Sequence, residues 1–160
     1  MSTPSNSRVD RAGRRLRDHQ RGIAPLTEAD LSAELAVVEA FRAAHAEPLT
    51  GVAAGLRVLV ADVSGREPEV GQRLKRMATI LDKLEREPTM ALSRMNDIAG
   101  CRAVVAGQAT VDVLVDRLRA ESSWKLLPKT WDYAAEPKPD GYRAKHLVAV
   151  ADGFRVEIQL

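Results

Sequence analysis

Apolar residues recur at helical spacing in several segments of the 160-residue chain. One stripe covers Leu31–Phe41 and follows Thr27, whose hydroxyl can cap the first turn of a helix. Similar stripes predict three more helices: one over about Pro48–Ser64, one with Thr79 in its first turn, and one over residues 110–120.

A period-two alternation replaces the helical pattern at the end of the chain. The segments KHLVAVA and FRVEIQL flank Asp152-Gly153, and such a two-residue link is typical of a β-hairpin. In that register His146 lies opposite Gln159 and diagonally across from Glu157, within reach of both. The other face of the second strand is apolar: Phe154, Val156, Ile158 and Leu160. The polar side chains on this face must contact either solvent or a ligand in a cleft, and the pattern does not distinguish between the two.

Short strands are expected in three further places: after Pro68, over Cys101–Ala106, and irregularly within WKLLPKTWDY. The order of elements predicts an α+β fold with a mixed, mostly antiparallel sheet and helices on one face. We expect a flexible basic N-terminal segment (1–22), helices that pack on the domain (23–66), and a core that contains the sheet (67–160).

The charge balance limits the classes of partner, because 24 Lys and Arg residues stand against 22 Asp and Glu residues. The basic run Arg8–Arg21 is either a solvated helix or an arm that contacts an anionic partner. The single cysteine, Cys101, excludes an internal disulfide and fits a reducing compartment. There is neither a secretory leader pattern nor an apolar run of about 18 residues. We therefore expect a soluble, cytoplasmic protein without membrane contact.

Two features suggest chemistry on phosphate groups. One predicted helix carries a polar side at steps of three and four, formed by Lys75, Arg76, Thr79, Lys83 and Arg86, of which all but Thr79 are basic. Either solvent or a triphosphate would satisfy this like-charged face. Asp97 precedes a turn and a strand, where it would cap the turn or project beyond the strand end. Beside Glu157 it would form a two-carboxylate site that suits Mg²⁺.

Four ordered blocks together resemble the synthetase domain of the RelA/SpoT family, over roughly residues 70–160. They are Arg73-x-Lys75-x-x-x-Thr79-Ile80-x-x-Lys83-Leu84-x-Arg86, Met95-x-Asp97-Ile98-Ala99-Gly100-x-Arg102, Asp132-Tyr133-x-x-x-Pro137-Lys138-x-x-Gly141-Tyr142-x-x-x-His146 and Glu157-Ile158-Gln159. Each block alone is weak, but all four in this order are specific. The resemblance implies a nucleotidyltransferase-like fold and transfer of the β,γ-pyrophosphate of ATP to the 3′-hydroxyl of GDP or GTP, which makes guanosine tetra- or pentaphosphate alarmones.

The same resemblance implies roles for individual residues. Asp97 and Glu157 would hold Mg²⁺, and Glu157 would also activate the attacking hydroxyl. The residues implied in ATP binding are Arg73, Lys75, Thr79, Lys83, Arg86 and Arg102. Tyr142 would stack on the guanine of the acceptor, and the remaining acceptor contacts would come from Gly141, Lys138, His146 and Gln159.

Departures from the family pattern leave the acceptor open. Asp140 replaces a frequent asparagine, and Ala144 replaces a common serine. The family usually continues beyond the position of Leu160 with Arg-Thr and a further helix, so we expect a core truncated at its C-terminal end. The alternatives are a toxin that pyrophosphorylates the 3′ end of tRNA and an inactive nucleotide-binding module. Candidate partners are therefore ATP, GDP or GTP, tRNA, a second copy of the chain and a neutralising antitoxin.

Overall fold

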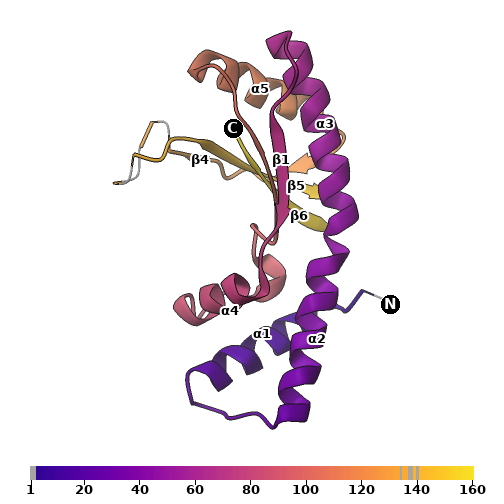
Figure 1. Ribbon diagram of the computed structural model, residues 1–160, viewed down its shortest axis with the longest axis vertical. Helices are drawn as coiled ribbons and strands as arrows, with labels where there is room; N and C mark the ends of the chain where they lie inside the picture. Colours follow the sequence, from indigo (N-terminus) through magenta and orange to yellow (C-terminus); the bar gives the residue numbers. More distant parts are fainter. Residues whose placement is uncertain (1–2, 134, 137–138, 140) are drawn as a thin grey trace.

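The computed structural model describes residues 3–133, 135–136, 139 and 141–160. Its helices are α1 (Asn6–Gln20), α2 (Glu28–Ala44), α3 (Ala46–Ser64), α4 (Met77–Arg86), the short 3₁₀ helix η1 (Leu92–Arg94) and α5 (Gln108–Glu121). Its strands are β1 (Val70–Leu74), β2 (Ala99–Ala103), β3 (Lys125–Leu126), β4 (Trp131–Asp132), β5 (Lys145–Ala151) and β6 (Phe154–Gln159). Figure 1 shows α2 and α3 following each other along one side of the molecule. None of the described helices is long and apolar enough to cross a membrane.

The described strands form one mixed sheet in the order β1-β2-β6-β5-β3, and β4 pairs with another part of β5. The β2–β6 pair is parallel, and the other described pairs are antiparallel. This topology confirms the predicted α+β fold with a mixed, mostly antiparallel sheet. The parallel pair also matters for the site, since it places Gly100 of β2 in register with Glu157 of β6.

The β5–β6 hairpin has the predicted register. Asp152 and Gly153 adopt φ values of 51° and 82°, as a two-residue turn that matches the right-handed strand twist requires. His146 pairs with Gln159 across the two strands. The apolar face of β6 is buried in the core, whereas Glu157 lies on the opposite face.

Helices α3 and α5 cover one face of the sheet and enclose the larger apolar core. This core includes Leu56 and Val60 of α3, Leu114 and Leu118 of α5, and Cys101, Leu147 and Ile158 of the sheet. Each leucine-sized side chain buried here stabilises the fold by about 1.5–3 kcal/mol. Burial raises the pKa of the Cys101 thiol to about 12, so the thiol stays protonated and packs as a small apolar group.

The N-terminal segment is not flexible as expected for residues 1–22; of the two interpretations of the basic run Arg8–Arg21, the structure shows a helix. Residues 6–20 form α1, whose buried Val9, Ala12 and Leu16 pack with residues of α2 and α4. These three residues recur at helical spacing, so a short apolar stripe is enough to anchor a basic helix. Two of its arginines are also used inside the molecule, since Arg8 and Arg15 both form ion pairs with the buried carboxylate of Glu34.

Helix α1 also supports the segment between α4 and β2, which carries Asp97. Asp10 accepts hydrogen bonds from the backbone N of Ser93 at 2.8 Å and from its hydroxyl at 3.0 Å. Gly13 lies so close to this segment that an added Cβ would be 3.0 Å from the Cβ of Leu92. The N-terminal helix therefore helps to fix the position of the Asp97 segment. Figure 1 shows α1 beside α4 at one end of the molecule.

Candidate active site

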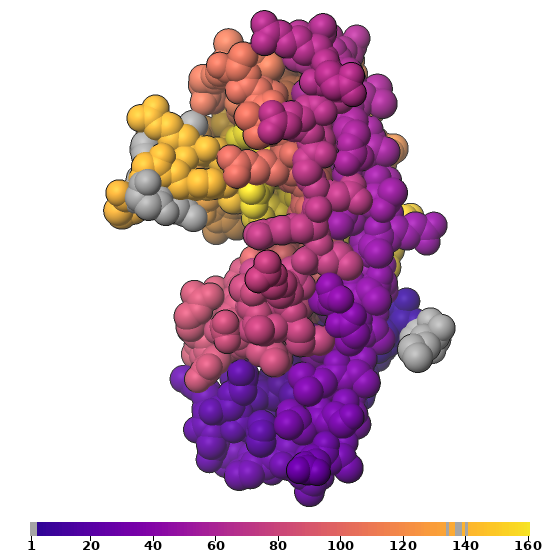
Figure 2. Space-filling model, viewed as in Figure 1, coloured from indigo at the N-terminus to yellow at the C-terminus, as the bar shows by residue number. Residues whose placement is uncertain are grey.

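A cleft of about 760 Å³ lies on the sheet face opposite α3 and α5. Eight of the predicted site residues line it: Arg73, Lys83, Asp97, Arg102, Tyr142, His146, Glu157 and Gln159. In the space-filling view, the surface is indented between α4 and the region around β4 (Figure 2). Segments far apart in the sequence therefore contribute to one cleft.

Strand register arranges the floor of the cleft in rows. Arg73 of β1, Gly100 of β2 and Glu157 of β6 lie side by side across three strands. A neighbouring row consists of Gly71, Arg102, Gln159 and His146. Because Gly100 has no side chain, the floor between the guanidinium of Arg73 and the carboxylate of Glu157 stays open to a ligand.

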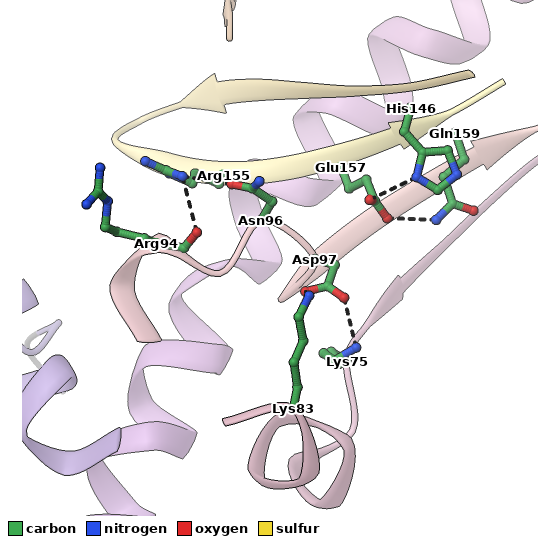
Figure 3. A network of polar contacts seen from close by, with 9 residues as sticks. All are labelled: Lys75, Lys83, Arg94, Asn96, Asp97, His146, Arg155, Glu157 and Gln159. Atoms are coloured by element: carbon green, nitrogen blue, oxygen red, sulfur yellow. Dashed lines mark hydrogen bonds and ion pairs between the residues drawn. The ribbon is translucent and has the colours of Figure 1, made fainter. Parts of the chain in front are cut away.

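Glu157 is held by two donors from its own hairpin. Its Oε1 lies 3.1 Å from Nδ1 of His146, and its Oε2 accepts a hydrogen bond from Nε2 of Gln159 at 2.7 Å (Figure 3). Burial acts to raise the pKa of Glu157, but the bonds to His146 and Gln159 outweigh it and bring the pKa below its ordinary value. The carboxylate is therefore ionised and oriented at neutral pH.

Two tyrosines line the part of the cleft beside His146. The hydroxyl of Tyr142 lies 2.9 Å from Nε2 of His146 and 3.4 Å from Oε1 of Gln159, which closes a ring of polar contacts through Glu157. Burial raises the pKa of Tyr142, so its hydroxyl remains a donor. Tyr133 also lines the cleft, with its ring 5.0 Å from that of His146. Sequence reasoning gave Tyr133 no role, although it stands in the third block.

Asp97 is held by cations instead. Its Oδ2 accepts a hydrogen bond from Lys75 at 2.9 Å and its Oδ1 accepts one from Lys83 at 3.0 Å (Figure 3). Burial acts to raise the pKa of Asp97, but the two lysines bring it below its ordinary value. The charge of Asp97 in turn acts to raise the pKa of Glu157, because the two carboxylates lie near enough to repel each other.

A second network ties the Asp97 segment to β6. Arg155 donates hydrogen bonds to Oδ1 of Asn96 at 2.7 Å and to the carbonyl oxygen of Arg94 at 3.2 Å (Figure 3). Arg155 and Glu157 point to the same face of β6. This strand therefore carries the carboxylate of Glu157 and also the arginine that holds the segment bearing Asp97. No local sequence pattern marks Arg155 and Asn96 as partners.

The remaining predicted residues lie differently. Lys75 does not line the described cleft but reaches Asp97 from the connector between β1 and α4. Thr79 and Arg86 are exposed on α4, outside the residues that line the cleft. Gly141 has a φ of 79° directly before Tyr142, a conformation that favours glycine. Lys138 falls outside the described residues.

The carboxylate oxygens in the cleft suit a metal ion that is bound jointly by the protein and by the phosphate groups of a nucleotide. Among the described residues, no three His, Cys, Asp or Glu side chains gather as a metal site. Two carboxylates on one cleft nevertheless suit Mg²⁺, because this ion keeps several waters and takes phosphate oxygens as ligands. Each oxygen of Asp97 accepts one hydrogen bond from a lysine, so a cation bound there would either share these oxygens with Lys75 and Lys83 or replace one of the two lysines.

Residues 72–160 match the family described as the region found in RelA / SpoT proteins. This match covers more than half of the chain, and the chain therefore belongs to this family. The resemblance drawn from the four sequence blocks is confirmed.

Similar proteins include pyrophosphokinases and alarmone synthetases. GTP pyrophosphokinase YjbM of Bacillus subtilis (strain 168) is 34% identical over 80 residues, which make up 49% of this chain but only 37% of that protein. The crystal structure of small alarmone synthetase 1 from Bacillus subtilis, bound to its product pppGpp, has a TM-score of 0.56 and 27% identity, over 70% of this chain and 68% of that one. A GTP pyrophosphokinase family protein from Streptococcus pneumoniae shares the fold, with a TM-score of 0.65 and 24% identity over 76% of this chain and 67% of that one.

Proposed function

We propose that this protein is a pyrophosphokinase that transfers the β,γ-pyrophosphate of ATP to the 3′-hydroxyl of GDP or GTP. One observation carries the proposal: Asp97 and Glu157 line the same cleft, with arginines on one side and tyrosines on the other. The relative whose structure was solved with pppGpp supports a guanine nucleotide as the acceptor.

In the proposed reaction, the 3′-oxygen of the acceptor attacks the β-phosphorus of ATP. A bond forms between these two atoms, and the bond from the β-phosphorus to the oxygen that bridges it to the α-phosphate breaks. AMP leaves with that bridging oxygen. Glu157 accepts the hydroxyl proton, because its lowered pKa keeps the carboxylate ionised. His146 and Gln159 hold the carboxylate in one orientation while it does so.

The donor nucleotide would bind on the β1–α4 side. Arg73 and Arg102 line this part of the cleft and would neutralise phosphate oxygens, as Lys75 and Lys83 would when they leave Asp97. Mg²⁺ held by Asp97 and Glu157 would supply further charge neutralisation at the transferred phosphates. Thr79 and Arg86 remain proposed donor contacts from the exposed side of α4.

The acceptor would bind on the β4–β5 side. Tyr142 offers a ring face for the guanine, and its hydroxyl would have to leave His146 if the ring turns onto the base. His146 and Gln159 would then contact the sugar or phosphates. Gly141 and Lys138 remain proposed acceptor contacts.

Transfer of radioactive label tests the proposal. The purified protein is incubated with Mg²⁺, ATP labelled at its γ-phosphate, and GDP, GTP or deacylated tRNA in separate reactions. Label on the guanine nucleotide is the expected result. Label on tRNA would instead support the toxin alternative, and ATP binding without any transfer would support the inactive module.

The structure bears on the tRNA alternative through α1. That alternative rests in part on the basic run Arg8–Arg21, which could contact a nucleic acid. Arg8 and Arg15 are paired with Glu34, which reduces the positive charge that α1 presents to a nucleic acid. We therefore favour the guanine nucleotide.

A further inference from the structure

Lys145 forms two ion pairs on the side of β5 away from the cleft. Its Nζ lies 2.9 Å from Oδ1 of Asp112 on α5 and 3.1 Å from Oδ2 of Asp132 on β4. The three side chains line a second, smaller cavity of about 380 Å³. The Lys145 side chain is 15% exposed, whereas the side chains of Asp112 and Asp132 are 53% and 36% exposed, so solvent partly screens both pairs.

Asp132 and Lys145 stand at the two ends of the segment that carries both tyrosines of the cleft. They pair directly in the β4–β5 ladder, and the N of Tyr133 donates a hydrogen bond to the carbonyl of Ala144 at 2.9 Å. Oδ1 of Asp132 also accepts a hydrogen bond from the N of Ala135 at 3.0 Å. The carboxylate that Lys145 holds therefore also holds the backbone of Ala135.

Alternation of side chains connects this back face to the cleft. Tyr133 follows Asp132 and His146 follows Lys145, so both neighbours point to the cleft side. Their rings meet edge to face at 5.0 Å. Strand β4 has only two residues, and so short a ladder holds the segment weakly without further contacts. The ion pairs of Lys145 supply such contacts and add a link to α5.

We propose that Lys145 is a positioning residue for the acceptor nucleotide. By bridging Asp112 and Asp132, it ties the end of β4, next to Tyr133, to α5 and so positions Tyr133 and His146 at the acceptor side of the cleft. This inference rests on the proposed function. The donor-side residues come from β1, α4, β2 and their connectors, and none of these elements carries the three charges. Loss of the bridge should therefore weaken acceptor binding and leave ATP binding unchanged.

Kinetics of two single variants test the inference. Lys145→Met and Asp112→Asn should each raise the KM for GDP about three- to tenfold, which is the range for losing one or two partly exposed ion pairs. The KM for ATP should stay within about twofold, because the donor side is untouched. Lys145→Arg keeps a cation between the carboxylates and should restore most of the acceptor affinity.

Asp116→Asn is the matched control. Asp116 lies one helical turn from Asp112 and lines the same cavity, but in the described part of the chain it is not an ion-pair partner of Lys145. Its replacement makes the same charge change and should leave both KM values as in the wild type. Because Asp112 is exposed on α5, its variant stays informative if Lys145→Met folds poorly.

The outcomes separate this inference from the proposed function. Equal shifts in the KM for GDP and ATP, or no shift in either variant, would overturn the positioning role in an active enzyme. If the wild type transfers no label, the proposed function fails. The role of Lys145 is then tested by measuring GDP binding with titration calorimetry. Weaker GDP binding by Lys145→Met but not by Asp116→Asn supports the inference. Unchanged binding, or no GDP binding by the wild type, overturns it.

Discussion

The two carboxylates of the cleft are held in different ways. Asp97 lies in a connecting segment, and its oxygens accept hydrogen bonds from the ammonium groups of Lys75 and Lys83. Glu157 lies within β6, and its partners are an imidazole and an amide from the same hairpin. Burial acts to raise the pKa of both, yet both end below their ordinary values.

This difference indicates separate tasks. The partners of Asp97 are cations on long side chains, so a divalent ion can replace them and free the lysines for phosphate oxygens. The partners of Glu157 are fixed by strand register, so they keep the carboxylate oriented while chemistry takes place. One carboxylate is expected to exchange its partners and the other to keep them.

Replacing Glu157 should give the largest effect on activity. Glu157→Gln removes the proposed base and one proposed metal ligand, so kcat should fall by at least about a hundredfold in the label-transfer assay. The amide oxygen still accepts one hydrogen bond from the hairpin, so the free energy of unfolding should change by about 1 kcal/mol in urea titration. The exposed Glu67→Gln is the control. A folded Glu157→Gln protein with wild-type transfer would remove Glu157 from the mechanism.

Replacing Asp97 should affect stability in a pH-dependent way. Asp97→Asn leaves Lys75 and Lys83 without their shared anion and should lower the free energy of unfolding by about 1–3 kcal/mol at pH 7. The folded pKa of Asp97 is lowered, so this contribution is complete above the unfolded value of about 4. It should disappear as the pH falls through the folded pKa.

Denaturation of the wild type and of Asp97→Asn between neutral and acidic pH measures this gap. The exposed Asp82→Asn on α4 is the matched control and should show a small gap throughout. If the gap for Asp97→Asn stays constant as the pH falls, the ion pairs with the lysines do not stabilise the folded protein.

Breaking the contact between the two carboxylate-bearing segments should have a smaller effect. Arg155→Gln shortens the side chain that bonds to Asn96 and to the Arg94 carbonyl. The Asp97 segment would then be less well placed relative to β6, and kcat should fall about tenfold. Steady-state kinetics measure this, with the exposed Arg66→Gln as control. Equal kcat values for the two variants would show that Arg155 does not position the site.

The sequence predicts the contacts of the β5–β6 hairpin better than those that place Asp97, because the hairpin is local. The turn at Asp152-Gly153 and the alternation around it determine which residues pair. The contact between His146 and Glu157 follows from that register. Asp97 reaches the same cleft only through the parallel β2–β6 pair, a long-range contact that no local period reveals. The residue pattern offers Asp97 as a possible half of a two-carboxylate site, but it does not show that Asp97 and Glu157 lie close together.

Sequence patterns give the wrong local structure where long-range contacts determine it. Basic residues at steps of three and four predict that Lys75 lies on a helix, but β1 extends to Leu74 and α4 begins at Met77. The low apolar content of residues 1–22 predicts a flexible arm. In the structure, the buried partner Glu34 lies on another helix and pairs with two arginines of α1.

The central claim is that Asp97 and Glu157 act on one divalent cation together with ATP. Electron paramagnetic resonance with Mn²⁺ in place of Mg²⁺, in the presence of a non-hydrolysable ATP analogue, measures this most directly. We expect the wild type to bind Mn²⁺, and Asp97→Asn and Glu157→Gln each to bind it at least about tenfold more weakly. Wild-type affinity for Mn²⁺ in both variants would contradict the account.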